Sequence, residues 1–408
     1  MTTGIFNTGN FTTDLAAKSF AAMITRLMPN GNAPLFALSS MLSDETALQV
    51  EHGFFSKTMI FPEMKLDGAI GDGIITAWQV DTTANLLPGM IMRVDSTGEN
   101  IIIDSITDAT NVVVTRGVGT VTAILIADNI EIYQVGNAFE EASDRPLANN
   151  IIPVRVTNLT QIFRNTWAIS GSAQATKVIA GDSTDAENRQ DCAALHAADI
   201  EKALFFGQKS SGTRNGQPFR TMAGLVAMIE DASFYPPIYA GVVNSFTAGG
   251  TTNWTQLLGF LDPVFNQATD PKGSAERVLF VGGAAKLVIN EIGRLNGTYH
   301  LVDGQTNFGL QFTTLTTPRG KFRLIEHPLF NTNTSWSAMA VGVDLPTFRL
   351  AYLAGRKTQN MEFNTSGKAA ADNGIDAVGG TLTTELTTVI KNTPANVVIN
   401  GLTAAAAG

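Results

Sequence analysis

Apolar residues recur at helical spacing over one long stretch of the chain, from Thr184 to about Phe206. Steps of four, three and four residues place them on one face of a helix, and they are Ala193, Ala197, Ile200 and Leu204. Thr184 and Glu187 match the Thr-x-x-Glu capping box, and Gly207 is predicted to end the helix as a left-handed C-cap. A helix with one apolar face needs a partner surface along its whole length. The flanking sequence offers mainly β-structure for that surface.

Upstream of this helix, short apolar runs alternate with Gly and Pro turns about every ten residues, as in a small antiparallel barrel or sandwich. The predicted strands are 74–80, 90–94, 100–106, 111–116 and 130–135. Residues 74–136 are therefore predicted to form an inserted β-subdomain. Two more extended segments, 151–164 and 166–172, then lead back to the long helix.

Downstream of the helix, the pattern mixes both periods and predicts an α+β region over 220–400, with helices packed on one sheet. The predicted helices are 221–229, 254–267 with a kink at Pro263, and 283–295 with Leu287, Val288 and Ile292 facing inward. The predicted strands are 278–281, 309–315, 320–325, 337–343, 348–354 and 381–390.

The first 45 residues have the pattern of an arm. A helix is predicted from Asp14 to Met28 and is stopped by the Pro-Asn-Gly turn at 29–31. The remainder is polar and carries isolated apolar residues such as Phe36 and Leu38. Because such a segment cannot bury these residues by itself, we expect it to lie on another surface, such as that of a second subunit.

Composition narrows the class of protein. At 408 residues, the chain should divide into two or three parts. Charged residues are only 15% of the chain, which predicts a surface that another molecule covers. The net charge of −9 argues against sequence-independent binding of nucleic acid, since that requires a basic face. With one cysteine, no signal-peptide pattern and no apolar run long enough for a bilayer, the chain is predicted to be soluble and made in a cytoplasm.

Three segments could carry chemistry. Cys192, His196 and Asp199 fall at helical spacing, which would suit a thiol nucleophile with its base or part of a metal site, but a small buried core cysteine is the favoured interpretation. The turn from Val281 to Lys286 contains two glycines between a strand and a helix. It lacks the spacing of known phosphate-binding loops, so close packing of strand and helix is favoured over a phosphate site.

The third segment is a cluster of charges after the predicted β-subdomain. Its members are Glu140, Glu141, Asp144 and Arg145. Paired carboxylates can perform acid and base chemistry, but a loop of mixed charge is more often a solvated face or a salt-bridge patch between subunits, and the patch is favoured. No catalytic, cofactor-binding or metal-binding residue is therefore assigned, and the chain is not predicted to be an enzyme.

Several segments, taken in order, resemble the major capsid proteins of tailed bacteriophages with the fold named after phage Hong Kong 97. The resemblance is closest to a branch with an extra β-subdomain. The matching segments are 87–89 with 113–117, 135–141, 158–163 leading to 170–173, 199–207, 384–389 and 398–402. They extend over most of residues 85–402, and none of them is a catalytic signature.

The resemblance implies a domain plan. Residues 1–45 would be an N-terminal arm, and 46–175 an extended loop bearing the β-subdomain at about 74–136. Residues 176–220 would form a peripheral domain with a spine helix at 184–206, 221–380 mostly an axial domain, and 381–408 a C-terminal strand and tail. Some of the terminal strands would return to the peripheral sheet.

The resemblance also implies a structural function. Copies would assemble as hexamers and pentamers into an icosahedral head that encloses double-stranded DNA without reading its sequence, in the host bacterial cytoplasm. The expected partners are a portal, a separate scaffolding protein and a decoration protein, with no membrane and no cofactor. The alternatives are another phage structural protein, such as a tail-tube or decoration protein, and, third, an enzyme built on Cys192 and His196. A tail protein should lack a long helix between a β-excursion and an α+β domain.

Overall fold

The chain divides into two compact units in the computed structural model, residues 1–54 with 155–408 and residues 55–154. The structure describes residues 34–39, 42–57, 61–148, 150, 152–176, 184–235, 243–266, 275–296, 302–307, 310–363 and 376–406. The helix predicted at 14–28 lies outside these residues. Within the described ranges, no helix combines the length and the apolar character that a membrane span requires.

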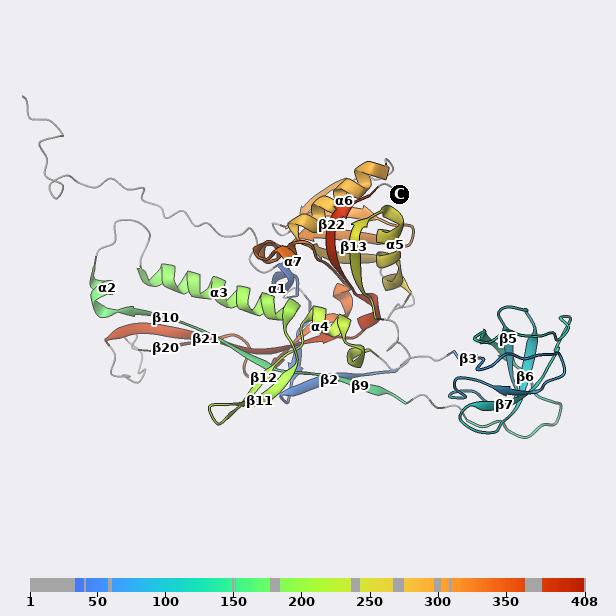
Figure 1. Ribbon diagram of the computed structural model, residues 1–408. Coiled ribbons are helices and arrows are strands. Elements are labelled where there is room, and N and C mark those ends of the chain that lie inside the picture. The colour runs from blue at the N-terminus through green and yellow to red at the C-terminus, as the bar shows by residue number, and fades with distance from the viewer. Residues whose placement is uncertain are drawn as a thin grey trace, which may run out of the picture. The chain divides into compact units, whose positions relative to one another are not determined.

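A seven-stranded mixed sheet organises much of the larger unit, in the order β13-β22-β18-β14-β17-β16-β15. Figure 1 labels β13 and β22, which lie side by side. Its strands are β13 (Ser245–Thr252), β14 (Glu276–Val281), β15 (Val302–Asn307), β16 (Leu310–Thr316), β17 (Lys321–Glu326), β18 (Ala340–Val343) and β22 (Val397–Ala405). β14 pairs in parallel with β17 and antiparallel with β18. Residues 277–281 of this central strand are all buried, which explains its nearly continuous apolar sequence.

Helices cover one face of this sheet. They are α5 (Trp254–Leu261), which continues as a 3₁₀ turn through Asp262–Phe265, and α6 (Gly283–Asn296). Leu257 of α5 and Ile292 of α6 pack in one core cluster with Leu279 of β14, while the alternate residue Phe280 joins a different cluster. Pro263 lies where α5 gives way to the 3₁₀ turn, as the predicted kink requires.

A second sheet of five strands contains β1 (Glu45–Ala47), β10 (Gln161–Ser170), β19 (Phe348–Leu353), β20 (Gln359–Phe363) and β21 (Ala377–Ile390). The prediction of a single sheet for 220–400 was wrong, because β19, β20 and β21 pair here instead. β10 and β21 are antiparallel over ten residues, from Gln161↔Leu386 to Ser170↔Ala377. The sequence also missed one inner strand of the seven-stranded sheet. Residues expected to be a C-terminal tail form β22, which lies between β13 and β18.

Helix α3 spans Thr184–Phe206, the range that the sequence predicts, and runs beside β10 and β21 (Figure 1). Its buried face differs from the predicted stripe, because Ala193 is exposed. The buried residues at steps of four are Cys192, His196, Ile200 and Leu204. The apolar pattern alone therefore predicted a buried face that is rotated slightly about the helix axis from the observed one, because the buried His196 counts as polar in such a pattern.

Gly207 ends α3, but not as the predicted left-handed cap, since it is absent from the residues with positive φ. A Cβ at this position would lie 2.6 Å from the Ala203 carbonyl oxygen and 2.7 Å from that of Met222. Glycine is therefore needed for close backbone approach. This approach lets the Gly224 amide donate to the Gly207 carbonyl at 2.9 Å and starts α4 (Leu225–Glu230) against the end of α3.

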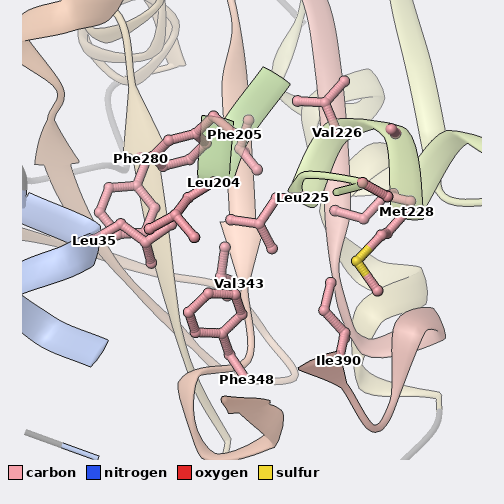
Figure 2. Close-up of a cluster of buried hydrophobic side chains, with 14 of the residues drawn as sticks. Leu35, Leu204, Phe205, Leu225, Val226, Met228, Phe280, Val343, Phe348 and Ile390 are labelled. Carbon is pink, nitrogen blue, oxygen red and sulfur yellow. The ribbon is translucent and has the colours of Figure 1, made fainter. Parts of the chain in front are cut away.

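The main core gathers residues that are far apart in the sequence (Figure 2). Leu35 of α1 (Pro34–Ser39) is fully buried there, beside Phe205 of α3, Phe280 of β14 and Phe348 of β19. Leu35 of the predicted arm thus lies on another surface, as expected, but that surface belongs to its own chain and not to a second subunit. Burial of one such leucine contributes roughly 1.5–3 kcal/mol.

The smaller unit is an antiparallel sheet of six strands in the order β3-β8-β5-β6-β7-β4. Its strands are β3 (Glu63–Lys65), β4 (Ala77–Gln79), β5 (Met90–Val94), β6 (Asn100–Ile106), β7 (Asn111–Thr115) and β8 (Glu131–Asn137). Backbone hydrogen bonds from Asp67 to Gln79 (3.0 Å) and from Asp81 to Lys65 (2.9 Å) join the two end strands, so the sheet closes into a barrel. The predicted range of 74–136 was too narrow, because β3 pairs with β8.

Shorter elements complete the described chain. They are β2 (Glu51–Ser56) paired with β9 (Val154–Leu159), the hairpin of β11 (Ser210–Arg214) and β12 (Gln217–Thr221), α2 (Gly171–Ala175), α7 (Thr334–Ser337), and 3₁₀ turns at Ala232–Phe234, Pro328–Thr332, Leu345–Thr347 and Thr393–Ala395. Three details of the predicted helices and strands were wrong. Leu287 of α6 is 71% exposed, and part of the strand predicted at 337–343 is the end of α7. The helix predicted at 221–229 begins only at Leu225, because Thr221 is the last residue of β12.

Candidate functional site

The Cys192 and His196 side chains are both buried on α3. The His196 imidazole, however, makes its hydrogen bonds to residues other than Cys192. Its Nδ1 lies 2.7 Å from Asn165 Oδ1 on β10, and its Nε2 lies 2.8 Å from Thr384 Oγ1 on β21. A base for Cys192 would need a free ring nitrogen within hydrogen-bond reach of the thiol. Both nitrogens already have partners, so the geometry supports the packing interpretation of Cys192.

The electrostatics point the same way. Burial raises the pKa of the Cys192 thiol, which disfavours the reactive thiolate. Burial also lowers the pKa of His196, and the Asp199 carboxylate opposes this only in part. Asp199 itself is exposed and accepts a hydrogen bond from Asn165 Nδ2 at 3.0 Å. His196 and Asp199 thus belong to a hydrogen-bonded network that joins α3 to the five-stranded sheet, and Cys192 is a buried residue on the same helix.

The turn between β14 and α6 is filled by side chains of the same protein. The Gly283 amide donates to Asn331 Oδ1 at 2.7 Å, and the Ala284 amide donates to Ser337 Oγ at 3.1 Å. A Cβ on Gly282 would lie 2.3 Å from the Ser337 carbonyl oxygen. These amides are therefore occupied, and the glycines serve close packing, as the favoured interpretation predicts.

The cluster at Glu140, Glu141, Asp144 and Arg145 is exposed. Glu140 borders a cavity of 580 Å³ on the barrel unit, which Asp104 and Phe139 also line. The proposed salt-bridge patch between subunits stays a prediction for these residues. Among the residues that the structure describes, no group of three or more His, Cys, Asp or Glu side chains is placed to hold a metal ion.

A buried polar cluster that the sequence did not reveal lies around Glu201 of α3. This carboxylate is 0% exposed and accepts three hydrogen bonds of 2.8 Å, from the amides of Leu35 and Phe36 and from His327 Nε2. The His327 ring is also buried and stacks on Phe330, with 4.5 Å between centroids. Glu201 therefore holds the start of α1 and the end of β17 against α3. Its position four residues before Phe205 was the available signal, since that spacing places it on the buried face.

The barrel unit contains a buried ion pair between Glu99 and Arg116. Arg116 donates from Nε to Glu99 Oε1 (3.0 Å) and from Nη2 to Glu99 Oε2 (2.6 Å), and Nη2 also donates to the Ile124 carbonyl oxygen (2.6 Å). The two side chains are 3% and 0% exposed, and the guanidinium lies 5.3 Å from the Trp78 ring. This pair ties the barrel wall to the loop that carries Ile124, and that loop is itself apolar and open to solvent.

Comparison with known proteins identifies the family of the chain. A model of the SU10 major capsid protein family matches residues 4–403. The chain belongs to this family. A major capsid protein of Pseudomonas phage PaMx41 is 36% identical over 408 residues, which cover 98% of this chain and 96% of that protein. The tail-tube or decoration alternative is thereby disfavoured.

Two solved capsid structures are more distant. The capsid of the native GTA particle has a TM-score of 0.47 and 9% identity over 98% of each chain. The Mycobacterium phage Adephagia structure has a TM-score of 0.43 and 10% identity over 99% of each chain. These scores add no argument to the assignment, which rests on the family and on the phage PaMx41 relative.

A phage major capsid protein is a structural component of the virion capsid and associates with copies of itself. This role accounts for apolar side chains that the isolated chain leaves open. On the barrel unit, Phe61, Ile74 and Leu125 are 76%, 84% and 66% exposed, and on the larger unit Leu48 is 84% exposed. Isolated soluble domains rarely expose such residues in groups, whereas surfaces that bind partners do.

Proposed function

We propose that this major capsid protein assembles as hexamers and pentamers into the icosahedral head of a tailed phage, with the fold named after phage Hong Kong 97. The observation that carries the proposal is the family match over residues 4–403. The long helix α3 beside the ten-residue β10–β21 pairing, with a separate seven-stranded sheet, suits the expected peripheral and axial domains.

The domain plan follows from this pairing. We propose that α3 and the five-stranded sheet form the peripheral domain, that the seven-stranded sheet with α5 and α6 forms the axial domain, and that the barrel is inserted into the extended loop. β22 then belongs to the axial domain and not to a tail. Residues 1–45 would act as the N-terminal arm.

The distribution of charge supports a shell around double-stranded DNA. Residues 55–154 contain five Lys and Arg against 13 Asp and Glu, a net charge of −8, so the other 308 residues of the chain carry only −1. A shell subunit whose larger unit is nearly neutral would neither hold packed DNA tightly nor repel it strongly. We also propose a portal, a separate scaffolding protein and a decoration protein as partners, with assembly in the host bacterial cytoplasm.

Electron microscopy of the protein, co-produced with the scaffolding protein of its phage, tests the proposal. We expect closed shells of uniform diameter. Monomers alone, or open tubes, would contradict it. A matched variant, Cys192→Ala, addresses the enzyme alternative, because we expect it to form shells in the same yield as the unchanged protein.

A further inference from the structure

The cavity on the barrel unit has the chemistry of a binding site for a cation. Its volume is 580 Å³, within the range of pockets that hold small ligands. Two carboxylates border it, Asp104 within β6 and Glu140 after β8, and the Phe139 ring forms another wall. Asp104 accepts a hydrogen bond from Thr115 Oγ1 at 2.7 Å, and no basic side chain lines the cavity.

The wall of the cavity is fixed by close packing. Gly89 has φ +85°, and a Cβ there would lie 2.4 Å from the Phe139 ring. The Ala138 amide donates to the Gly89 carbonyl at 2.9 Å, and the Gly89 amide donates to Ile103 at 2.8 Å. The backbone therefore holds Phe139, which stays 45% exposed, beside the two carboxylates. An aromatic face next to carboxylates suits a guanidinium group, which can stack on the ring while it donates hydrogen bonds to the carboxylates.

The larger unit carries a group of the matching chemistry. The β11–β12 hairpin is a regular two-stranded ribbon, and its turn contains Asn215 (φ 51°) and Gly216 (φ 73°). Residues 203–229 include Lys209, Arg214 and Arg220 and no acidic residue, although the chain as a whole is acidic. β11 is exposed along its entire length, and Arg214 is its last residue.

Of these three cations, Arg214 is the one that is available. The Lys209 ammonium donates to the Thr157 carbonyl oxygen at 2.8 Å and lies 5.7 Å from the Phe234 ring. Arg220 is only half-exposed. Arg214 lies beside the turn and is exposed, and none of the salt bridges among the described residues involves it.

We propose that Arg214 of one subunit docks into the cavity between Asp104 and Glu140 of a second copy of this chain. The proposal rests on the self-association of a capsid protein. The hairpin brings the guanidinium to the carboxylates and the Phe139 ring. Because its two strands are already paired, docking orders little additional backbone and costs little conformational entropy. Charge complementarity favours a copy of this chain over a partner of different sequence as the occupant, because every copy carries both the acidic cavity and the basic hairpin.

Charge reversal in shells tests the contact. We expect Arg214→Glu alone, and Asp104→Lys with Glu140→Lys, each to lower the yield of closed shells about tenfold or more. Combining all three substitutions in one chain should restore most of the yield. Lys202→Glu, an exposed reversal on α3, is the control for net charge and should leave the yield unchanged. Circular dichroism of each unassembled variant separates a loss of docking from a loss of folding.

Several outcomes would overturn the docking. If the cavity variant loses assembly while Arg214→Glu does not, the cavity binds a different partner. If both retain full yield, or if the triple variant is no better than either parent, the contact does not exist. Absence of shells from the unchanged protein would instead contradict the proposed function, so the two failures are distinguishable.

A crosslinking experiment decides between two copies and one. Chains carrying Arg214→Cys and chains carrying Asp104→Cys are co-assembled and oxidised with copper phenanthroline. We expect a reducible dimer that neither variant gives by itself, and the buried native Cys192 serves as the background in both. A chain that carries both substitutions and crosslinks only within itself would overturn the proposal.

Discussion

Glu201 offers the sharpest test of how the larger unit is held together. Its carboxylate is fully buried and accepts from the Leu35 amide, the Phe36 amide and His327 Nε2, each at 2.8 Å. Glu201→Ala removes all three acceptor contacts at once, whereas the surrounding apolar core remains. The variant therefore isolates the contribution of one buried polar residue on the spine helix.

The expected cost follows from what the substitution leaves behind. A buried donor that is left without an acceptor costs about 1–3 kcal/mol, and Glu201→Ala leaves three such donors. The two amides of α1 can recover water if α1 detaches, so their costs do not simply add. We expect Glu201→Ala to lower the free energy of unfolding by about 3–5 kcal/mol. Glu201→Gln keeps one acceptor oxygen and should cost about 1–3 kcal/mol.

Urea unfolding of the unassembled subunit measures this change, and hydrogen exchange locates it. The amides of Leu35 and Phe36 should lose protection in both Glu201 variants, because their acceptor is removed or altered. Lys202→Ala, an exposed neighbour on the same helix, should change stability by no more than about 0.5 kcal/mol. A loss below about 1 kcal/mol in Glu201→Ala, with unchanged exchange at Leu35, would refute the reasoning.

Three further predictions concern α3 and the barrel. Because burial lowers the pKa of His196, folding favours the neutral ring. The contribution of His196 to stability is therefore present above about pH 6.5 and is lost as the pH falls below that value. In urea unfolding at several pH values, His196→Gln should flatten the dependence of the free energy of unfolding on pH in this range. Ala197→Pro should break α3 at a cost of about 3 kcal/mol or more and abolish particles in electron microscopy, and wild-type yield would contradict the helix. Arg116→Met should destabilise the barrel by about 3–5 kcal/mol, because Glu99 stays buried without its partner. Adding Glu99→Gln should recover part of that loss. The fluorescence of the buried Trp78 during unfolding measures both changes. An unchanged Trp78 transition in Arg116→Met would argue against the role of the pair.

The sequence pattern predicted the elements whose signals are local. The range of α3 agrees with its prediction at both ends, and most strands of the barrel fall where turn residues and apolar runs place them. Both signals arise within short windows, through helical spacing and through Gly and Pro turns. The resemblance to capsid proteins rested on the order of these elements, and the family match agrees with it.

Features that depend on distant segments could not be read in this way. β22 pairs in parallel with β13, about 150 residues earlier, and no local pattern distinguishes that strand from a tail. The role of Gly207 was also hidden, because it depends on the approach of Met222 and Gly224 and not on its own φ. Phe139 and Asp104 form the cavity only once β6 and β8 share a barrel.

The buried polar residues of α3 explain why its apolar stripe was predicted on a slightly wrong face, and they also set how the helix sits. Apolar contacts such as those of Ile200 and Leu204 tolerate a shift along the helix axis, since one helical turn of about 5.4 Å brings similar side chains to similar places. Hydrogen bonds do not tolerate it, because His196 meets Asn165 and Thr384 in only one position. A one-turn slip would leave these groups buried without partners, at a cost of several kcal/mol. The residues that resembled an active site therefore select a single register for α3 against β10 and β21, on which identical subunits of a shell depend.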